Sequence, residues 1–480
     1  MKLDLTQLDW SLVGWYPYTW AWLAESRRDW YLADQRTHQC TPVIPAKLPG
    51  SVQDDLLRAG LIPDWNVAIN PPLCEWVEHR HWEYFTHVTI PADWQGQRLI
   101  LRADGLDYAG YILVDGQSVA SFQGMMTPHE FDLSAHLQPG ATQRLSIIFT
   151  EAPHEQGQIG YTSSSHLFKA RYAYMWDWCP RLVPLGIWDQ LALIAEGPTR
   201  LLGCLPYARY DAASKSGSLA LRLEMEAPAP SVVTCRARLL DGDRVVHESA
   251  QACALAPGRN EARLTVAESL AIEPWYPNGL GAQKLYTLEV QIESAGEAVG
   301  AWRGRVGFKQ VAWSLCEGAP ANAEPWLCRV NGKPLFLQGV NWTPVRITYG
   351  SVMREQYAAR LRLYAEMGCN ILRVWGGAMP EKEDFYDLCD ELGLMVWQEF
   401  PLSSSGGDNL PPDDPQALAD LAQIAASYIW RRGGHVSHLL WAGGNELARH
   451  DGRNTPIDES HPAIRLMAGV VAHLDPGKRF

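Results

Sequence analysis

The chain has 480 residues, of which 41 are basic and 54 acidic, so its formal net charge is −13. At this length two to four domains are expected, and a hydrophobic share of 47% indicates a packed globular protein. The acidic balance, without a basic block, argues against nucleic acid as a partner. No window approaches the roughly 18 uncharged apolar residues of a membrane span, so no membrane partner is expected.

The ten cysteines are scattered and form no C-x-x-C pair. Neither a zinc site nor a disulfide framework is therefore predicted, and we expect no metal and no cofactor. The first ten residues, MKLDLTQLDW, lack the apolar core of a signal peptide. These features favour a reducing, cytoplasmic location.

The first region, residues 1–199, consists of short alternating runs separated by turn signals. In YILVDGQSVA (111–120), for example, Asp115 and Gly116 stand between two such runs. Asp-Gly supplies the positive φ angles of a tight hairpin, so the spacing predicts a β-sandwich of the jelly-roll type. One helix is predicted here, over residues 50–60.

The second region, residues 200–312, continues this pattern with longer runs. An Asp-Gly turn at 241–242 again joins two alternating segments. About 110 residues of this pattern suit a small immunoglobulin-like β-sandwich.

The third region, residues 313–480, changes to alternating strands and helices. We predict strands over 334–342, 370–377, 394–400 and 438–446, and helices over 354–368, 381–393, 414–434 and 460–476. Four such units in succession predict a parallel sheet, either doubly wound or part of a (β/α)₈ TIM barrel. No G-x-G-x-x-G follows the first strand, which favours the barrel.

Each of these strands ends in polar or aromatic residues. The pairs are Asn341 and Trp342, Arg373 and Trp375, Gln398 and Glu399, and Asn445 and Glu446. Barrel enzymes build their active sites from the C-terminal ends of several strands, so we expect an active site at this edge.

The last strand end, WAGGNE (441–446), presents a carboxylate next to an amide. Cleavage of a glycosidic bond needs an acid that protonates the leaving oxygen, and a side chain that binds a ring hydroxyl as the oxocarbenium ion develops. Glu446 and Asn445 are therefore candidates for these two roles.

Several motifs resemble glycoside hydrolase family 2, and within it the β-mannosidase-like members. They are WAGGNE, NILRVWGGAMPEKEDFYDLCDELGLMVWQEF, FLQGVNWTP, RYAYMWDWCPRLVPLGIW (171–188) and LPGSVQDDLLRAGLIPDWN. The combination of W-D-W-x-P-R with R-V-W-G-G is the most specific of these signals. The resemblance covers essentially the whole chain. It implies three domains: a jelly-roll sandwich of the sugar-binding type (1–199), an immunoglobulin-like sandwich (200–312) and the first half of the catalytic barrel (313–480).

The resemblance also implies roles for individual residues. Glu446 matches the general acid/base, and Asn445 matches the residue that contacts the sugar's 2-hydroxyl. Trp375 corresponds to the platform under the terminal sugar, and Arg373 to the arginine that holds the nucleophile. Glu399 stands where these mannosidases usually carry a sugar-binding Asp.

Two residues of the first sandwich are also implied in substrate binding. Trp176 and Asp177 match a loop that reaches across to the sugar site. The alternatives are that Trp176 and Trp178 only pack between domains and that Asp177 caps a turn. Arg373, likewise, could be a structural ion-pair residue.

Other residues near the strand ends have open or structural interpretations. Asn341 and Trp342 could support the site from behind. His435 and His438 flank the fourth strand, and for these a capping or surface role is expected rather than metal binding.

The sequence departs from the family pattern beside Glu446. RRGGHVSH stands where the family usually resembles R-N-H-P-S, and Gly444 stands where the subgroup generally has Asn. Both departures bear on how Glu446 is positioned.

A retaining glycosidase needs a second carboxylate, the nucleophile, about 5 Å from the acid/base. In this family it is a Glu late in the barrel, and a complete barrel needs about 250 residues. We therefore expect the nucleophile to lie beyond this chain, in a missing C-terminal barrel half, and the 480-residue chain alone to be inactive.

The resemblance implies a retaining, exo-acting β-mannosidase that releases terminal β-D-mannose from a β-mannoside or oligosaccharide in carbohydrate catabolism. Another family 2 exo-β-glycosidase, such as an exo-β-glucosaminidase or a β-galactosidase-like enzyme, is the alternative within that class. A non-catalytic carbohydrate-binding fragment is the alternative outside it.

Overall fold

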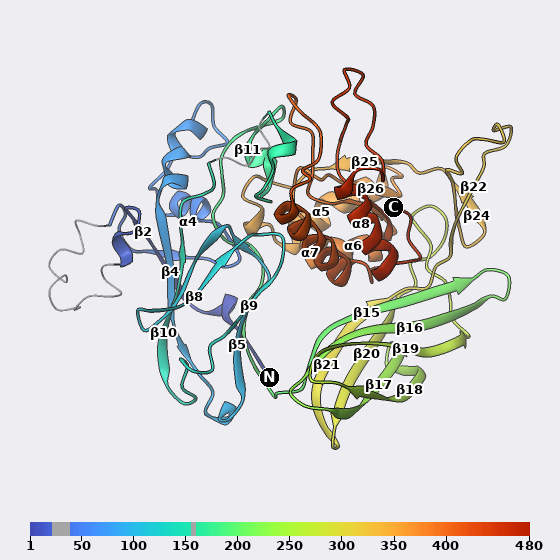
Figure 1. Ribbon diagram of the computed structural model, residues 1–480, viewed down its shortest axis with the longest axis horizontal. Helices are drawn as coiled ribbons and strands as arrows, with labels where there is room; N and C mark the ends of the chain where they lie inside the picture. The colour runs from blue at the N-terminus through green and yellow to red at the C-terminus, as the bar shows by residue number, and fades with distance from the viewer. Residues whose placement is uncertain (22–38, 155–159) are drawn as a thin grey trace.

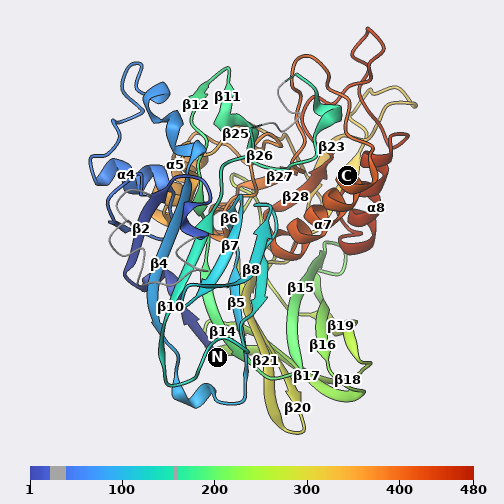
Figure 2. The ribbon, with the colours of Figure 1, turned by 60° about the vertical axis from the view of Figure 1, so that its left-hand side comes forward.

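Figure 1 shows the computed structural model, which describes residues 1–21, 39–154 and 160–480. Two β-sandwiches, coloured blue to teal and green to yellow, lie beside an α/β unit in orange and red. The turned view in Figure 2 places the strands of both sandwiches below the parallel strands β25 to β28. The multidomain β plus partial α/β-barrel architecture is as predicted.

The first sandwich has a six-stranded sheet, in the order β3-β2-β4-β10-β7-β8, and a four-stranded sheet, in the order β1-β14-β5-β9. Apolar residues from both sheets form its core. The strands are β1 (Lys2–Asp4), β2 (Trp10–Trp15), β3 (Ile44–Ala46), β4 (His81–Thr89), β5 (Arg98–Ala103), β7 (Ala109–Val114), β8 (Gln117–Gln123), β9 (His129–Asp132), β10 (Thr142–Phe149) and β14 (Leu191–Glu196). Two short pairs join β6 (Leu106–Asp107) to β13 (Gly186–Ile187) and β11 (Tyr174–Trp176) to β12 (Cys179–Arg181).

The local signals in this region form the expected structures. Helix α4 (Val52–Arg58) begins after Ser51, whose hydroxyl accepts a hydrogen bond from the Asp54 amide, as an N-cap should. Strands β7 and β8 meet at Asp115 and Gly116, whose φ angles of 49° and 81° are those of a tight hairpin. The predicted helix and hairpin are confirmed.

The second sandwich consists of seven strands in two antiparallel sheets, ordered β15-β16-β19 and β18-β17-β20-β21. Its strands are β15 (Arg200–Asp211), β16 (Ser216–Ala227), β17 (Ser231–Asp241), β18 (Arg244–Leu255), β19 (Gly258–Leu270), β20 (Tyr286–Ser294) and β21 (Glu297–Val306). A separate apolar core lies between the sheets. Seven antiparallel strands in two packed sheets are the immunoglobulin-like architecture.

The α/β unit contains a four-stranded parallel sheet whose strand order follows the chain order. Its elements are β25 (Gly339–Trp342), α5 (Arg354–Glu366), β26 (Ile371–Val374), α6 (Glu383–Leu392), β27 (Met395–Glu399), α7 (Pro415–Arg432), β28 (His438–Ala442) and α8 (Pro462–Leu474). A doubly wound sheet reverses its strand order, whereas a barrel winds each strand next to the preceding one. The observed order is that of a barrel.

The predicted strand over 334–342 is wrong as a single element. Its start belongs to β24 (Lys333–Leu335), which pairs antiparallel with β23 (Leu327–Val330), and β23 pairs with β22 (Val311–Ser314). Phe336 then projects into solvent, and the parallel sheet begins only at Gly339. The apolar run at 334–342 therefore contributes residues to two different sheets.

The first sandwich and the α/β unit share a buried polar interface. Lys169 and Tyr349, from the two sides, both donate hydrogen bonds to the fully buried carboxylate of Asp107. Nearby, the Arg171 amide donates to the carbonyl of Gly377, 2.9 Å away. These bonds fix the sandwich against the C-terminal edge of the parallel sheet. Among the described helices, none is long and apolar enough to cross a membrane.

Candidate active site

Arg373, near the end of β26, connects the neighbouring strand ends. Its Nε donates to Oε1 of Glu399 over 2.8 Å, and its Nη1 donates to Oδ1 of Asn341 over 3.0 Å. Its Nη2 donates to Oδ1 of Asn445 over 2.7 Å. A planar guanidinium can serve three acceptors in one plane, so this residue aligns side chains at or just beyond the ends of the other three strands.

Glu399, at the end of β27, is the buried partner of Arg373. Only 2% of the residue is exposed, and its second oxygen accepts a hydrogen bond from the Gly376 amide at 2.8 Å. Burial raises the pKa of this carboxyl, while Arg373 and the Gly376 amide oppose that shift. Glu399 therefore anchors both the arginine and the turn that follows β26.

Glu446 lies just beyond β28 in a left-handed conformation, with φ at 51°. Its side chain is exposed, and Ser404 Oγ donates to its Oε2 over 2.7 Å. Asn445 Nδ2 lies 3.4 Å from the same oxygen. One carboxylate oxygen is thus held by the protein, while the residue as a whole faces open space.

The departure at Gly444 has a structural cause. Its φ is 147°, and a Cβ placed there would lie 2.7 Å from the Leu402 carbonyl oxygen. An asparagine cannot occupy this backbone without moving the loop after β27. In this chain, therefore, glycine at 444 permits the turn that presents Glu446.

Aromatic residues of both domains meet beside Arg373. Trp375 is only 7% exposed and meets Trp176 and Trp178 in T-shaped arrangements, with ring centroids 5.0 and 6.1 Å away. Trp178 also stacks on Tyr172 at 5.3 Å and keeps 45% of its surface exposed. The β11–β12 hairpin of the first sandwich thus reaches the strand ends of the α/β unit, and Trp178 offers the open aromatic surface.

Asp177 occupies the turn of this hairpin next to Trp178 and is exposed. Its carboxylate accepts no hydrogen bond from the other described residues. The geometry therefore gives no support to the alternative in which Asp177 caps its own turn.

The strand-end residues alternate between two sides of the sheet. Asn341 and Glu399 point toward Arg373, whereas Trp342 and Gln398 point toward the helices. Trp342 Nε1 donates to buried Glu381 at 2.8 Å, and Gln398 accepts from Tyr386 at 2.7 Å. This is the two-residue period of a strand, and it assigns Trp342 to packing.

The serines of the loop after β27 were not predicted as site residues. Ser403 Oγ accepts from Asn445 Nδ2 at 3.0 Å, and Ser404 binds Glu446. Arg171 of the first sandwich donates to the Ser403 carbonyl. The run of three serines after an apolar strand was the available signal.

The expectation of a capping or surface role for the two histidines is wrong. His438 is fully buried against Trp441, with ring centroids 3.9 Å apart. His435 is bound by Asp390 at 2.8 Å and by Glu383 at 3.1 Å. Burial alone would lower the pKa of His435, but the two carboxylates raise it to about 10.

Two groups of described residues have the composition of metal ligands. The first combines Glu383 and His435 with Asp387, but a protonated imidazole cannot ligate a metal, and the two carboxylates pair with arginines.

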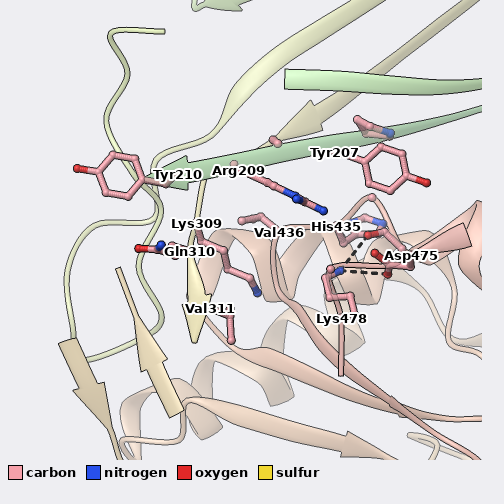
Figure 3. Close-up of a pocket in the computed structure, with 16 residues that line it drawn as sticks. Tyr207, Arg209, Tyr210, Lys309, Gln310, Val311, His435, Val436, Asp475 and Lys478 are labelled. Carbon is pink, nitrogen blue, oxygen red and sulfur yellow. Dashed lines mark hydrogen bonds and ion pairs between the residues drawn. The ribbon is translucent and has the colours of Figure 1, made fainter. Parts of the chain in front are cut away.

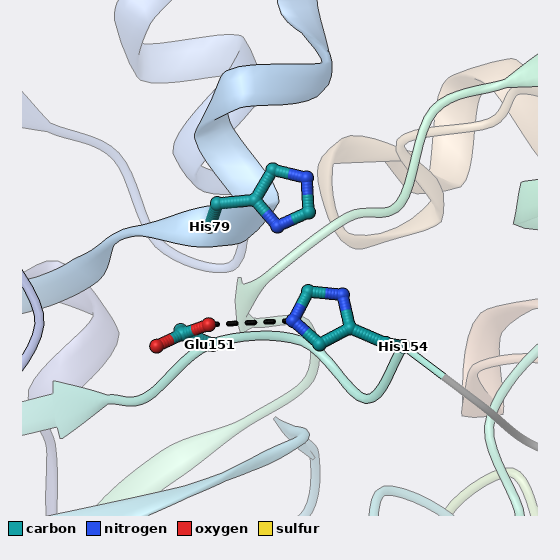
Figure 4. Close-up of side chains that lie close together, drawn as sticks. All are labelled: His79, Glu151 and His154. Carbon is teal, nitrogen blue, oxygen red and sulfur yellow. Dashed lines mark hydrogen bonds and ion pairs between the residues drawn. The ribbon is translucent and has the colours of Figure 1, made fainter.

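The second group, His79, Glu151 and His154, lies on the first sandwich (Figure 4). Its imidazole rings stack at 4.9 Å with an interplanar angle of only 21°. The ligating lone pairs lie in the ring planes, so nearly parallel rings do not aim at one ion. This arrangement is therefore not that of a formed metal centre.

Two sequence models of one enzyme family match the chain. The model described as "Glycosyl hydrolase 2 galactose-binding domain-like" matches residues 30–189, and "Glycosyl hydrolases family 2, TIM barrel domain" matches residues 325–477. The chain belongs to glycoside hydrolase family 2.

Within this family the chain is similar to β-mannosidases. Beta-mannosidase B of Thermothelomyces thermophilus is 30% identical over 430 residues, which are 86% of this chain and 48% of that protein. Beta-mannosidase of Mus musculus is 27% identical over 429 residues, 84% of this chain and 48% of that protein. The solved structure of a β-D-mannosidase from Dictyoglomus thermophilum aligns with a TM-score of 0.81 and 26% identity, over 100% of this chain and 57% of that one. The chain spans about half the length of the curated relatives it matches.

The contact between Arg373 and Glu399 predicts a pH-dependent loss of stability. Arg373→Met leaves a buried carboxylate without its counter-charge, so we expect a loss of about 3 to 5 kcal/mol at neutral pH. Without the arginine the pKa of Glu399 in the folded state rises further, so folded protein binds a proton that unfolded protein releases. The loss should therefore shrink as pH falls toward about 4.3, the value of an unperturbed Glu.

Urea unfolding of the variant at several pH values measures this effect. Arg373→Met combined with Glu399→Gln removes the carboxylate and should recover much of the loss and its pH dependence. Equal destabilisation of the single and double variants at every pH would contradict the assignment.

Proposed function

We propose that this chain carries the acid/base half of a retaining, exo-acting β-mannosidase-like active site that releases terminal β-D-mannose from non-reducing ends. One observation carries the proposal: the end of β28 and the Trp-Asp-Trp hairpin lie beside the same turn. Arg373 binds Asn445, the neighbour of Glu446, and Trp375 contacts the two tryptophans of the hairpin. The similarity to β-mannosidases supports the choice of sugar.

In this proposal Glu446 protonates the leaving glycosidic oxygen and later deprotonates the attacking water. Its exposure leaves one oxygen accessible to substrate, while Ser404 holds the other. Arg373 fixes the amide of Asn445 by binding its oxygen, which turns Nδ2 toward Glu446 and the sugar's 2-hydroxyl.

The sugar would rest between the barrel edge and the hairpin of the first sandwich. Trp375 forms the floor, Trp176 and Trp178 form one wall, and Asp177 binds hydroxyl groups. Carbohydrate sites need an apolar face beside polar acceptors, and the exposed surface of Trp178 next to Asp177 provides both. The role of Glu399 in this proposal is to orient Arg373, since its buried oxygens already bind protein donors.

The nucleophile is assigned to a part of the enzyme that this chain does not span, because a retaining mechanism needs a second carboxylate facing Glu446. Glu399 does not fit that role, since it is buried behind Arg373. We also propose domain divisions at 199/200 and 312/313. The first falls between the β14–β15 link and the start of β15, and the second falls within β22, just after the link that follows β21. Ten free thiols accord with a cytoplasmic location.

The choice of sugar is tested with a panel of aryl β-glycosides on an enzyme with a complete barrel. We expect the highest kcat/KM for the β-mannoside, with retention of anomeric configuration, because the hairpin and the β26 turn carry the mannosidase-like motifs. A clear preference for β-galactoside or β-glucosaminide would reassign the enzyme within the family. Sugar binding without any hydrolysis would support the non-catalytic alternative.

The role of Glu446 predicts a dependence on the leaving group. Glu446→Gln in the same enzyme should slow hydrolysis of oligosaccharides by about 10²- to 10⁴-fold, because their leaving oxygen needs protonation. The first step with an activated aryl glycoside should be slowed much less. Glu297→Gln, which alters an exposed carboxylate of the second sandwich, is the matched control. Unchanged turnover of both substrates would remove Glu446 from the mechanism.

The hairpin predicts that the first sandwich contributes to catalysis. Asp177→Ala should lower kcat/KM while the melting temperature stays nearly constant, because this exposed carboxylate has no described hydrogen-bond donor to lose. Asp243→Ala, at the exposed turn between β17 and β18, should leave both quantities unchanged. A lower melting temperature with full activity would instead favour the turn-capping role.

A further inference from the structure

A cavity of about 310 Å³ lies between the second sandwich and the base of the α/β unit, at the opposite end of β28 from Glu446. Its walls come from the end of β15, the link at 307–311, the loop at 433–436 and the segment after α8 (Figure 3). No step of the proposed reaction uses this cavity.

Three cationic side chains from three of these segments enter the cavity. Figure 3 shows the head groups of Arg209, Lys309 and Lys478 turned toward the same space. Lys309 is only 8% exposed, and its Nζ donates to the carbonyl of His438 at 2.9 Å. Within the described chain, no carboxylate lies at ion-pair distance from Arg209 or Lys309.

The nearby acidic groups already have protein partners, and one of these partners is Lys478. Asp475, the one carboxylate of the lining, accepts a hydrogen bond from Trp441 Nε1 at 3.0 Å and lies 3.4 Å from Lys478 Nζ. The imidazolium of His435 is bound by Asp390 and Glu383. The cavity therefore holds more positive than negative charge, which is costly where water is partly excluded.

The pKa of Lys309 reflects both its burial and the neighbouring positive charge. Burial, followed by the charge of Lys478, lowers the pKa of Lys309 to about 7, although Asp390, Cys328 and Asp475 act in the opposite direction. The Trp275 ring lies below the ammonium, 5.3 Å from its centroid. With a pKa in this range, Lys309 can gain a proton when an anion enters the cavity.

We propose that this cavity binds a tetrahedral oxyanion, a phosphoryl or sulfate group, held by Arg209, Lys309 and Lys478 between the second sandwich and the parallel sheet. Guanidinium and ammonium donors from separate segments are the usual partners of such groups. The volume of about 310 Å³ accommodates free phosphate or a small phosphate monoester. Lys478 Nζ also donates to the Gly433 carbonyl and Lys309 Nζ to the His438 carbonyl, so the cations that hold the anion also contact the segment from which β28 starts.

Isothermal titration calorimetry of the full chain with inorganic phosphate, sulfate and glycerol phosphate tests the proposal. We expect saturable binding of at least one of them with a dissociation constant below about 1 mM. Tighter binding of glycerol phosphate than of phosphate would identify a monoester as the natural ligand, and the reverse order would identify the free anion. Absence of binding by all three would overturn the proposal.

Substitutions of the cationic residues test whether the anion binds in this cavity. Arg209→Gln and Lys309→Met should each weaken binding about tenfold or more, as the loss of one charge-assisted hydrogen bond predicts. Arg209 is exposed on a strand, so its replacement tests the site even if Lys309→Met impairs folding. Arg303→Gln alters an exposed arginine of the same sandwich and should leave affinity unchanged. Equal affinity of Arg209→Gln and the unaltered chain would overturn the proposal.

Protonation provides an independent readout. An anion favours the charged form of Lys309, so binding above about pH 7 should take up a proton, and affinity should fall as pH rises. Sulfate does not titrate in this range, so its binding enthalpy in buffers of different ionisation enthalpy counts this proton. Lys309→Met should abolish the uptake. Proton uptake that persists in Lys309→Met would contradict the assignment of the titrating group.

Discussion

The geometry of the candidate site depends on one guanidinium surrounded by acceptors from neighbouring strands. Arg373 can reach Asn341 because these residues are paired in the register of β25 and β26. It can reach Glu399 because Trp397 is its register partner on β27 and Glu399 lies two residues further, on the same face. A shift of one residue in either pair would turn the acceptors toward the helices. The geometry of the candidate site therefore requires this register of the parallel strands.

This constraint extends beyond the sheet through the turn after β26. Glu399 also binds the Gly376 amide, and the adjacent Trp375 packs against the hairpin of the first sandwich. The buried bonds of Asp107 with Lys169 and Tyr349 hold that sandwich in place. Through these contacts the placement of Arg373 is linked to the first sandwich, a domain that begins more than three hundred residues earlier in the chain.

Features encoded by local sequence were predictable. Asp-Gly pairs predicted the hairpins, and hydrophobic period and Gly stops predicted the helices of the α/β unit. Strand ends rich in polar residues predicted which edge carries the candidate site, and Arg373, Glu399, Asn445 and Glu446 do meet there. Their partners were not predictable, because hydrogen bonds such as that from Ser404 to Glu446 depend on register and loop path. The split of the run at 334–342, and the burial of His438, likewise depend on tertiary pairing that no local pattern reveals.

The hairpin between β11 and β12 belongs to an N-terminal sandwich that can be exchanged as a unit. Its two tryptophans and Asp177 approach the barrel edge, yet they belong to a unit with its own core. Exchanging this sandwich between related enzymes would replace the hairpin beside the candidate site without changing a residue of the α/β unit, provided that the contacts of Asp107 and Trp375 are retained. Domain shuffling can therefore vary the surroundings of the candidate site in a way that substitutions confined to the α/β unit cannot.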